Sequence, residues 1–240
     1  MTLTVGTLDP TELAGIARSA VSCPATASMV AEGVEHLLDS DGLSLSERDG
    51  VPTFWCHRDA PVAVAARESR SALLRVTSGV AGSDDAGRPT EGASVVIAGR
   101  LTEEEVPGAC CADARVVTLT PSLVVVLEPA EDGSTTRRTV PLDLYTDHAH
   151  RLNEGYLRRA THHANECHAG ELVTSLALAT GAPRSELIAA SLAHLTPAGV
   201  EVCWIDLDGA HTRTVWFSRT ARTPSELSNL LRRELHAGLI

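Results

Sequence analysis

The segment Arg115–Glu128 reads RVVTLTPSLVVVLE, and it contains two short apolar runs, Arg115–Leu119 and Leu123–Glu128. Thr120-Pro121-Ser122 separates the two runs. Runs of about four to eight aliphatic and β-branched residues bounded by turn-forming residues are typical of β-strands. This segment therefore predicts two short strands joined by a turn.

The same pattern extends to both sides of this segment. Six further strands are predicted at Leu43–Ser46, Thr53–His57, Pro61–Ala65, Ala72–Thr77, Ala93–Leu101 and Thr136–Leu142. Turn sequences such as Arg48-Asp49-Gly50 lie between them. Up to eight short strands with no long helix among them indicate an antiparallel barrel or sandwich. Thr11–Leu38 is alanine-rich with apolar residues at helical spacing, which predicts two N-terminal helices broken at Pro24.

Helical periodicity returns after Leu142. It runs from about Asp147 to Ala179, and Ser185–His194 is expected to form a second helix. Gly199–Asp206 and His211–Phe217 then predict a hairpin around Asp208-Gly209, and Thr223-Pro224-Ser225-Glu226 has the capping residues of a last helix. A boundary near residue 145 is expected to separate a β domain, residues 1–145, from a small α+β domain, residues 146–240.

Composition excludes several classes of function. A net charge of -11 is unfavourable for a nucleic-acid-binding protein, because neutralising phosphates requires a cationic surface. No apolar run approaches the ~18 residues of a membrane span, and the N-terminus does not resemble a signal peptide, so we expect a cytoplasmic protein that binds no membrane. All 20 basic residues are arginine. The absence of lysine excludes Schiff-base chemistry.

The candidate functional residues cluster in His162-His163-Ala164-Asn165-Glu166-Cys167-His168. Helical spacing places His163, Cys167 and Glu171 on one face, with His168 at its edge. Imidazole and thiolate groups are common ligands of metals and metal cofactors. The alternative interpretation is a polar, solvated helix face.

His163–Ala169 resembles the His-Met-Asn-Glu-Asp-His-Ala signature that opens a small α+β domain in HugZ-like heme-utilisation proteins. Further similarity lies in Trp204–Gly209, in Val215-Trp216-Phe217 and in Thr223–Leu227. The β domain of that family resembles the FMN-binding split barrel of pyridoxamine-phosphate oxidase, and related chains occur as glutamyl-tRNA reductase binding proteins. The chain departs from the signature at Cys167 and Gly170, where the family has aspartates.

The resemblance implies an α+β fold, an antiparallel split β-barrel with N-terminal helices followed by a small C-terminal α-α-β-β-α domain. It also implies a homodimer, since two copies close each other's sheet edges and apolar faces. The function expected is heme binding, either for heme degradation in iron utilisation or for buffering and regulation. One alternative is an FMN-dependent oxidoreductase. The other is a non-enzymatic regulatory module whose protein partner is an enzyme of tetrapyrrole metabolism.

Heme requires an apolar slot, an axial ligand and positive groups near its propionates. The axial-ligand candidates are His168, His163, Cys167, His162 and His57, and the metal ligands expected are His168 and His163. Arg158 and Arg159 are candidate propionate partners, because a guanidinium matches a carboxylate bidentately. For FMN, the segment Arg67–Ser71 is the only cluster in the barrel that resembles a phosphate cradle.

Overall fold

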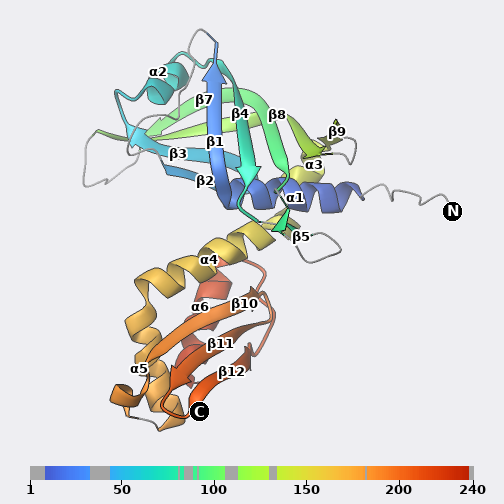
Figure 1. Ribbon diagram of the computed structural model, residues 1–240. Helices are drawn as coiled ribbons and strands as arrows, with labels where there is room; N and C mark the ends of the chain where they lie inside the picture. The colour runs from blue at the N-terminus through green and yellow to red at the C-terminus, as the bar shows by residue number, and fades with distance from the viewer. Residues whose placement is uncertain are drawn as a thin grey trace, which may run out of the picture. The chain divides into compact units, whose positions relative to one another are not determined.

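The computed structural model describes residues 9–32, 44–80, 82–83, 89–90, 92–105, 113–129, 134–181 and 183–237. The chain divides into two compact units, Met1–Gly155 and Tyr156–Ile240. The first unit is a curled antiparallel sheet with helices, a half-barrel, and the second combines helices with a three-stranded sheet (Figure 1). The predicted α+β fold class is confirmed.

The main sheet of the first unit has the strand order β1-β4-β7-β8-β3-β2, and β9 pairs with β8. Its strands are β1 Pro24–Ala31, β2 Ser44–Arg48, β3 Val51–His57, β4 Ser71–Ser78, β7 Ser94–Glu105, β8 Ala114–Pro129 and β9 Thr135–Val140. A separate pair of two-residue strands consists of β5 Gly82–Ser83 and β6 Pro89–Thr90. All pairings are antiparallel, as the alternating sequence pattern predicts.

The two strands predicted within Arg115–Glu128 form one continuous strand, β8. Pro121 pairs with Gly99 of β7 at a register shift between Ala98 and Gly99. A Cβ atom at Gly99 would lie 2.1 Å from the carbonyl oxygen of Thr120, so only glycine fits there. A bulge tolerates proline and bends the strand, which is why the turn signal marks a bend instead of a strand end.

The core of the half-barrel lies between the inner face of the sheet and helix α1, Pro10–Ser22. Proline begins α1, and the Glu12 carboxylate accepts a hydrogen bond from the Asp9 backbone N–H at 3.3 Å, as in a capping box. The largest fully buried apolar side chains of this core include Tyr145, Phe54, Met29, Leu74, Ile97, Leu101 and Leu119. Alternate residues of β4 are buried, which places one face of the strand in the core.

Two expectations for this unit were wrong. The second N-terminal helix after Pro24 is the strand β1, and residues 33–38 of that segment lie outside the described residues. Pro61–Ala65 was expected to be a strand but belongs to helix α2, Pro61–Arg67. Both segments are rich in alanine, which favours helices and is depleted in strands. Helix α2 follows this propensity, whereas the pairing of β1 with β4 overrides it.

A buried polar network joins α1 to two distant segments. Arg18 is fully buried and forms an ion pair with Glu47 at 3.0 Å. Its guanidinium also donates to the carbonyl oxygens of Tyr145, at 3.0 Å, and Asp147, at 3.3 Å. These residues lie at the end of α3, Leu142–Tyr145, and before the 3-10 turn η1, His148–His150. The network therefore ties α1, β2 and the chain after the barrel together.

The second unit contains two helices, a three-stranded sheet in the order β10-β11-β12 and a last helix. The elements are α4 Glu154–Cys167, which begins in the first unit, α5 Ala169–Thr180, the 3-10 turn η2 Arg184–Glu186, β10 Ala189–Thr196, β11 Gly199–Asp206, β12 Gly209–Trp216 and α6 Pro224–Ala237. The predicted β11–β12 hairpin is present, with Gly209 at φ 135° in its turn. The start of α6 also agrees, because Thr223 Oγ1 accepts a hydrogen bond from the Glu226 N–H at 3.2 Å.

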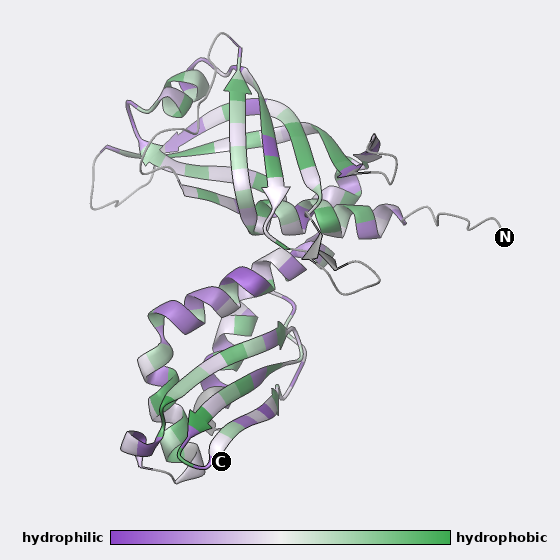
Figure 2. Ribbon diagram, viewed as in Figure 1, coloured by the Kyte–Doolittle hydropathy of each residue, from purple (hydrophilic) through white to green (hydrophobic). Residues whose placement is uncertain are grey.

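The helix expected at Ser185–His194 is absent. This segment forms η2 and most of β10, and Leu192 pairs with Val202 of β11. The sheet consequently has three strands. Figure 2 shows that α4 is mainly hydrophilic whereas β10 and β11 carry many apolar residues. Among the described residues, no helix is long and apolar enough to cross a membrane.

Candidate functional site

A cavity of about 660 Å³ lies within the second unit, between the α4–α5 helices, α6 and β10. This volume is in the range of about 300–1,000 Å³ typical of small-molecule sites. Its lining residues are Tyr156, Arg159, Ala160, His163, Ala164, His168, Glu171, Leu172, Ser175, Leu192, Leu195, Leu227, Ser228, Leu231 and Arg232. We call it the helix cavity.

Leucines from three elements supply the apolar wall of the helix cavity. Leu172 comes from α5, Leu192 and Leu195 from β10, and Leu227 from α6, and each is no more than 7% exposed. These side chains form part of the core of the unit, so their positions are fixed by packing. The cavity therefore offers a rigid apolar surface to a ligand.

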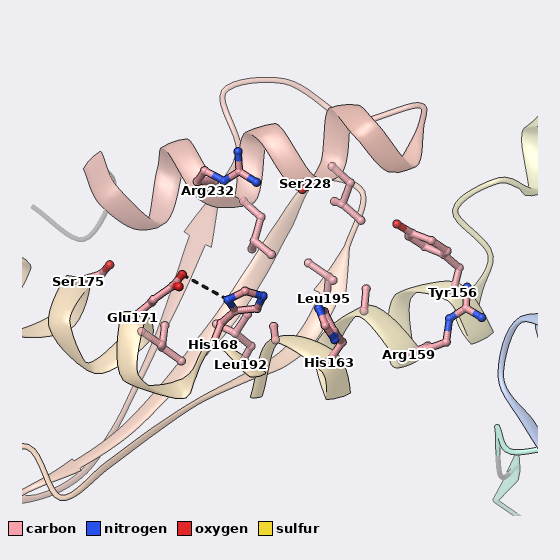
Figure 3. A pocket seen from close by; sticks show the side chains of 15 residues that line it. Tyr156, Arg159, His163, His168, Glu171, Ser175, Leu192, Leu195, Ser228 and Arg232 are labelled. Carbon is pink, nitrogen blue, oxygen red and sulfur yellow. Dashed lines mark ion pairs between the residues drawn. The ribbon is translucent and has the colours of Figure 1, made fainter. Parts of the chain in front are cut away.

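His168 stands at the junction of α4 and α5. Its backbone has φ -122° and ψ 15°, which interrupts the helix. Its N–H donates to the Ala164 carbonyl at 3.0 Å, and its carbonyl accepts from the Leu172 N–H at 3.0 Å. The junction is thereby bonded on both sides, and the imidazole extends towards α6 (Figure 3).

The His168 ring has a carboxylate partner. Nδ1 of His168 lies 3.3 Å from Oε2 of Glu171, and the His168 side chain is 49% exposed. A carboxylate at one ring nitrogen fixes the orientation of the imidazole and raises the basicity of the other nitrogen. Nε2 of His168 is thus the nitrogen available to a ligand. His163 contacts His168 edge to face, with ring centroids 5.3 Å apart and an interplanar angle of 79°.

Two arginines give the helix cavity a positive charge. Arg159 on α4 and Arg232 on α6 both line it. Within the described residues, neither guanidinium has an ion pair or a hydrogen bond. Burial raises the pKa of Tyr156, while the charge of Arg159 acts in the opposite direction. A leucine-lined cavity with two unpaired guanidinium groups suits an apolar ligand that carries carboxylates.

Asn165 holds one wall of the helix cavity in place. Its Oδ1 accepts from the Leu192 N–H at 2.7 Å, and its Nδ2 donates to the Leu192 carbonyl at 3.0 Å. The side-chain amide of α4 thus bonds both backbone groups of one residue on the outer edge of β10. This role was not apparent in the sequence, because Leu192 lies 27 positions away.

The remaining sequence candidates do not line the helix cavity. His162 points elsewhere on α4, where its Nδ1 lies 3.0 Å from Glu166 Oε2. Cys167 and Arg158 are exposed. His57 belongs to the first unit, at the end of β3, where its ring nitrogens lie 3.6 Å from Asp59 and 3.7 Å from Asp113.

Sequence reasoning missed the contribution of α6, namely Leu227, Ser228, Leu231 and Arg232. The available signal was the amphipathic pattern of this helix, in which apolar residues recur at helical spacing. For a metal held by protein ligands alone, the described part of the chain contains no group of three or more histidine, cysteine, aspartate or glutamate side chains.

A second cavity, of about 430 Å³, lies in the first unit and includes part of the predicted phosphate cradle. It is lined by Ala66, Arg67, Ser69, Thr102, Glu103 and Arg115. Glu103 forms ion pairs with Arg67 at 3.3 Å and with Arg115 at 3.0 Å. The carboxylate neutralises the guanidinium groups that a phosphate would need.

No protein-family model and no curated protein matches the chain. Among solved structures, a heme-binding protein from Mycobacterium smegmatis aligns at 15% identity and a TM-score of 0.38, covering 98% of this chain and 99% of that one. A protein of unknown function from Agrobacterium tumefaciens aligns at 18% identity and a TM-score of 0.40, covering 97% and 100%. General stress protein 26 from Bacillus anthracis aligns at 9% identity and a TM-score of 0.35, covering 53% of this chain and 99% of that one. Likenesses of this degree do not assign a family to the chain.

Proposed function

We propose that this protein binds heme in the helix cavity, with His168 as the axial ligand. The observation that carries the proposal is the His168–Glu171 pair within a leucine-lined cavity that also has two unpaired arginines. The resemblance to HugZ-like proteins points to the same ligand, and the signature that carries it includes this histidine. Split-barrel ancestry for the first unit is part of the same proposal.

The residues of the helix cavity fit heme in three respects. The porphyrin already supplies four nitrogen ligands, so the protein needs to provide only one or two. Nε2 of His168 meets that requirement without a larger ligand cluster. The leucines match the apolar porphyrin faces, and the guanidinium groups of Arg159 and Arg232 match the propionates.

We favour binding over degradation of heme as the role of the site. The two positions where the resembling family carries aspartates are Cys167 and Gly170 here. Cys167 is exposed, and neither residue lines the helix cavity, so these positions supply no carboxylate to a bound ligand. A buffering or regulatory role, including delivery of a heme-dependent signal to an enzyme of tetrapyrrole metabolism, needs only binding.

A titration of the purified protein with hemin, followed by visible absorption, tests the proposal. We expect a saturable Soret shift at one heme per subunit. His168→Ala should weaken binding by roughly tenfold or more and change the Soret position, because the iron loses its axial nitrogen. His162→Ala is the matched control, since it removes an exposed histidine from the same helix outside the cavity. A His168→Ala protein with unchanged affinity and spectrum would refute the assignment.

FMN is the alternative ligand, and an FMN fluorescence titration belongs in the same experiment. The geometry supports it less, because Glu103 already occupies the arginines of the cavity in the first unit. Saturable quenching of FMN together with no hemin shift would replace the heme proposal with the flavin one. Adding ascorbate and air to the hemin complex separates binding from turnover, and a stable Soret band is the expected result.

A further inference from the structure

The outward face of the half-barrel sheet carries an apolar row that crosses four adjacent strands. Val30 of β1 pairs with Leu73 of β4, Leu73 pairs with Ala98 of β7, and Ala98 pairs with Leu123 of β8. Val30, Leu73 and Leu123 are 43%, 42% and 44% exposed, whereas Met29, Leu74 and Val124 beside them are buried in the core. In a register of this kind the side chains stand next to one another on one surface.

Arginines predominate among the charges around this row, and among the described residues Glu32, two positions after Val30, is an exposed carboxylate beside it. Arg75, Arg100 and Arg137 occupy outward positions of β4, β7 and β9 and are exposed. Arg100 donates to the Ser69 carbonyl at 3.4 Å, and within the described residues none of the three has a carboxylate partner. Strands β1, β4 and β9, residues 94–102 of β7 and residues 114–127 of β8 contain no acidic residue.

We propose that this arginine-bordered face docks a partner protein that presents an apolar strip flanked by carboxylates. The basic face is notable because the whole chain has a net charge of -11. An apolar centre with arginine at its margin is the composition of a protein–protein interface. Unpaired guanidinium groups at the rim select an acidic partner and accelerate its association. This proposal is independent of the heme site.

Two other occupants fit the face less well. A second copy in a two-fold contact through this face would place two net-positive faces against each other, which is less favourable than an acidic partner, so the expected homodimer would use another surface. An anionic membrane surface is usually recognised by clusters of about four to eight basic residues, more than the three present here.

Photo-crosslinking identifies the partner. A benzophenone amino acid is introduced at Ser28 or Thr139, which are exposed on this face, and at Ser185 of the second unit as a control. The proteins are irradiated in an extract of the source cells, and adducts are identified by mass spectrometry. We expect a protein adduct from Ser28 and Thr139 that Ser185 does not give. The absence of such an adduct, or an adduct with a second copy of this chain, would overturn the proposal.

The identified partner is then purified and titrated against the full chain. Arg75→Glu/Arg137→Glu should weaken binding by roughly tenfold or more and reduce its salt dependence. Leu73→Thr keeps the charges and a strand-forming residue and should also weaken binding. Arg184→Glu reverses the charge of one exposed arginine in the second unit and should leave the affinity for the partner unchanged. Equal affinity for all variants, or binding of the chain to phosphatidylglycerol vesicles with the same dependence on Arg75 and Arg137, would contradict a protein-docking face.

Discussion

The buried network around α1 and the helix cavity use arginine in opposite ways. In the half-barrel, Arg18 is fully buried and bonded to Glu47 and to two backbone carbonyls. In the second unit, Arg159 and Arg232 line an open cavity without an ion pair within the described residues. A buried guanidinium without partners would be very costly, whereas a solvated one is tolerated. Arg18 is therefore a structural residue, and the cavity arginines are available for a ligand.

The same contrast applies to the carboxylates. Glu47 is 6% exposed in its side chain and accepts hydrogen bonds from Arg18, Ser22 and the Gly50 N–H. The Glu171 side chain is 78% exposed, and within the described residues its carboxylate forms an ion pair with the His168 ring alone. The first carboxylate completes a core, and the second orients an imidazole. Substitutions in the Arg18 network should accordingly change the unfolding free energy, whereas substitutions in the helix cavity should change ligand binding.

Arg18→Met should cause the largest loss of stability. Removing one partner of a buried ion pair leaves the Glu47 charge uncompensated, which costs about 3–5 kcal/mol of unfolding free energy. Urea denaturation followed by circular dichroism measures the loss. The double variant Arg18→Met/Glu47→Gln should recover part of it, because the remaining charge is removed. A loss below about 1 kcal/mol for the single variant would show that the network is not structural.

Asn165→Ala should destabilise the second unit by about 2 kcal/mol, because two hydrogen bonds to the Leu192 backbone are lost. Asn165→Asp keeps the acceptor for the Leu192 N–H but places a carboxylate oxygen against the Leu192 carbonyl, so it should not restore the lost stability. Hydrogen exchange at the Leu192 amide reports the local opening. Equal exchange rates in the wild type and Asn165→Ala would show that the amide does not hold the edge of β10.

How far the sequence predicts this structure depends on the range of each interaction. Strands with strict alternation, such as Ala72–Thr77, and helix starts with capping residues, such as Thr223–Glu226, were predicted well because their signals are local. Three alanine-rich segments, Pro24–Ala31, Pro61–Arg67 and Ala189–Thr196, were assigned to the wrong element. Alanine favours helices and is depleted in strands, so Pro61–Arg67 follows the propensity of its residues, whereas the pairing of β1 with β4 and of β10 with β11 overrides it.

The site follows the same rule. Helical spacing placed His163, Cys167 and Glu171 on one face, with His168 at its edge. The helix is interrupted at His168, and His163, His168 and Glu171 line the helix cavity whereas Cys167 is exposed and does not. Arg232 comes from α6, more than sixty positions after His168, and no local pattern links the two. His57 was grouped with these candidates because histidine is a suitable ligand, yet it belongs to the other unit. The residue type alone does not say how far apart two side chains lie.

Acid should weaken the half-barrel in two steps. Burial and the charge of Arg18 hold the pKa of His150 below its ordinary 6.5, although Asp147 acts in the opposite direction. As the pH falls below 6.5, the unfolded chain takes up a proton that the folded protein resists, so stability falls until the folded pKa is reached. The hydrogen bond from Arg151 lowers the pKa of Asp49 below 3.8. The stability that the ionised Asp49 contributes is therefore fully present above pH 3.8, and it is lost as the pH falls through the pKa of the folded state.

Unfolding curves at a series of pH values measure both steps. His150→Gln should flatten the profile just below pH 6.5 and leave the lower step in place, whereas Asp49→Asn should do the reverse. Arg151 and the Asp49 carboxylate are 2.6 Å and 2.9 Å apart in two hydrogen bonds, so the lower step should be the clearer one. A His150→Gln profile that follows the wild type would contradict the first assignment.

Arg159→Gln/Arg232→Gln should have the smallest effect on stability and a large one on the ligand. Because neither guanidinium has a partner within the described ranges, the unfolding free energy should change by no more than about 0.5 kcal/mol. Hemin affinity should fall roughly tenfold or more, since hydrogen bonds to charged groups are worth about 1.5–3 kcal/mol each. Hemin dimethyl ester, which has no free carboxylates, should bind the variant and the wild type equally.

The ester tests whether the carboxylate charge of the ligand matters. Arg158→Gln tests whether the position of the arginine matters, because Arg158 is exposed on the same helix as Arg159 and does not line the helix cavity. That control should keep wild-type affinity for hemin. If the double variant lost affinity for hemin and its ester alike, the arginines would shape the cavity without contacting the propionates. If it lost stability instead, the contrast between the paired Arg18 and the unpaired cavity arginines would be wrong.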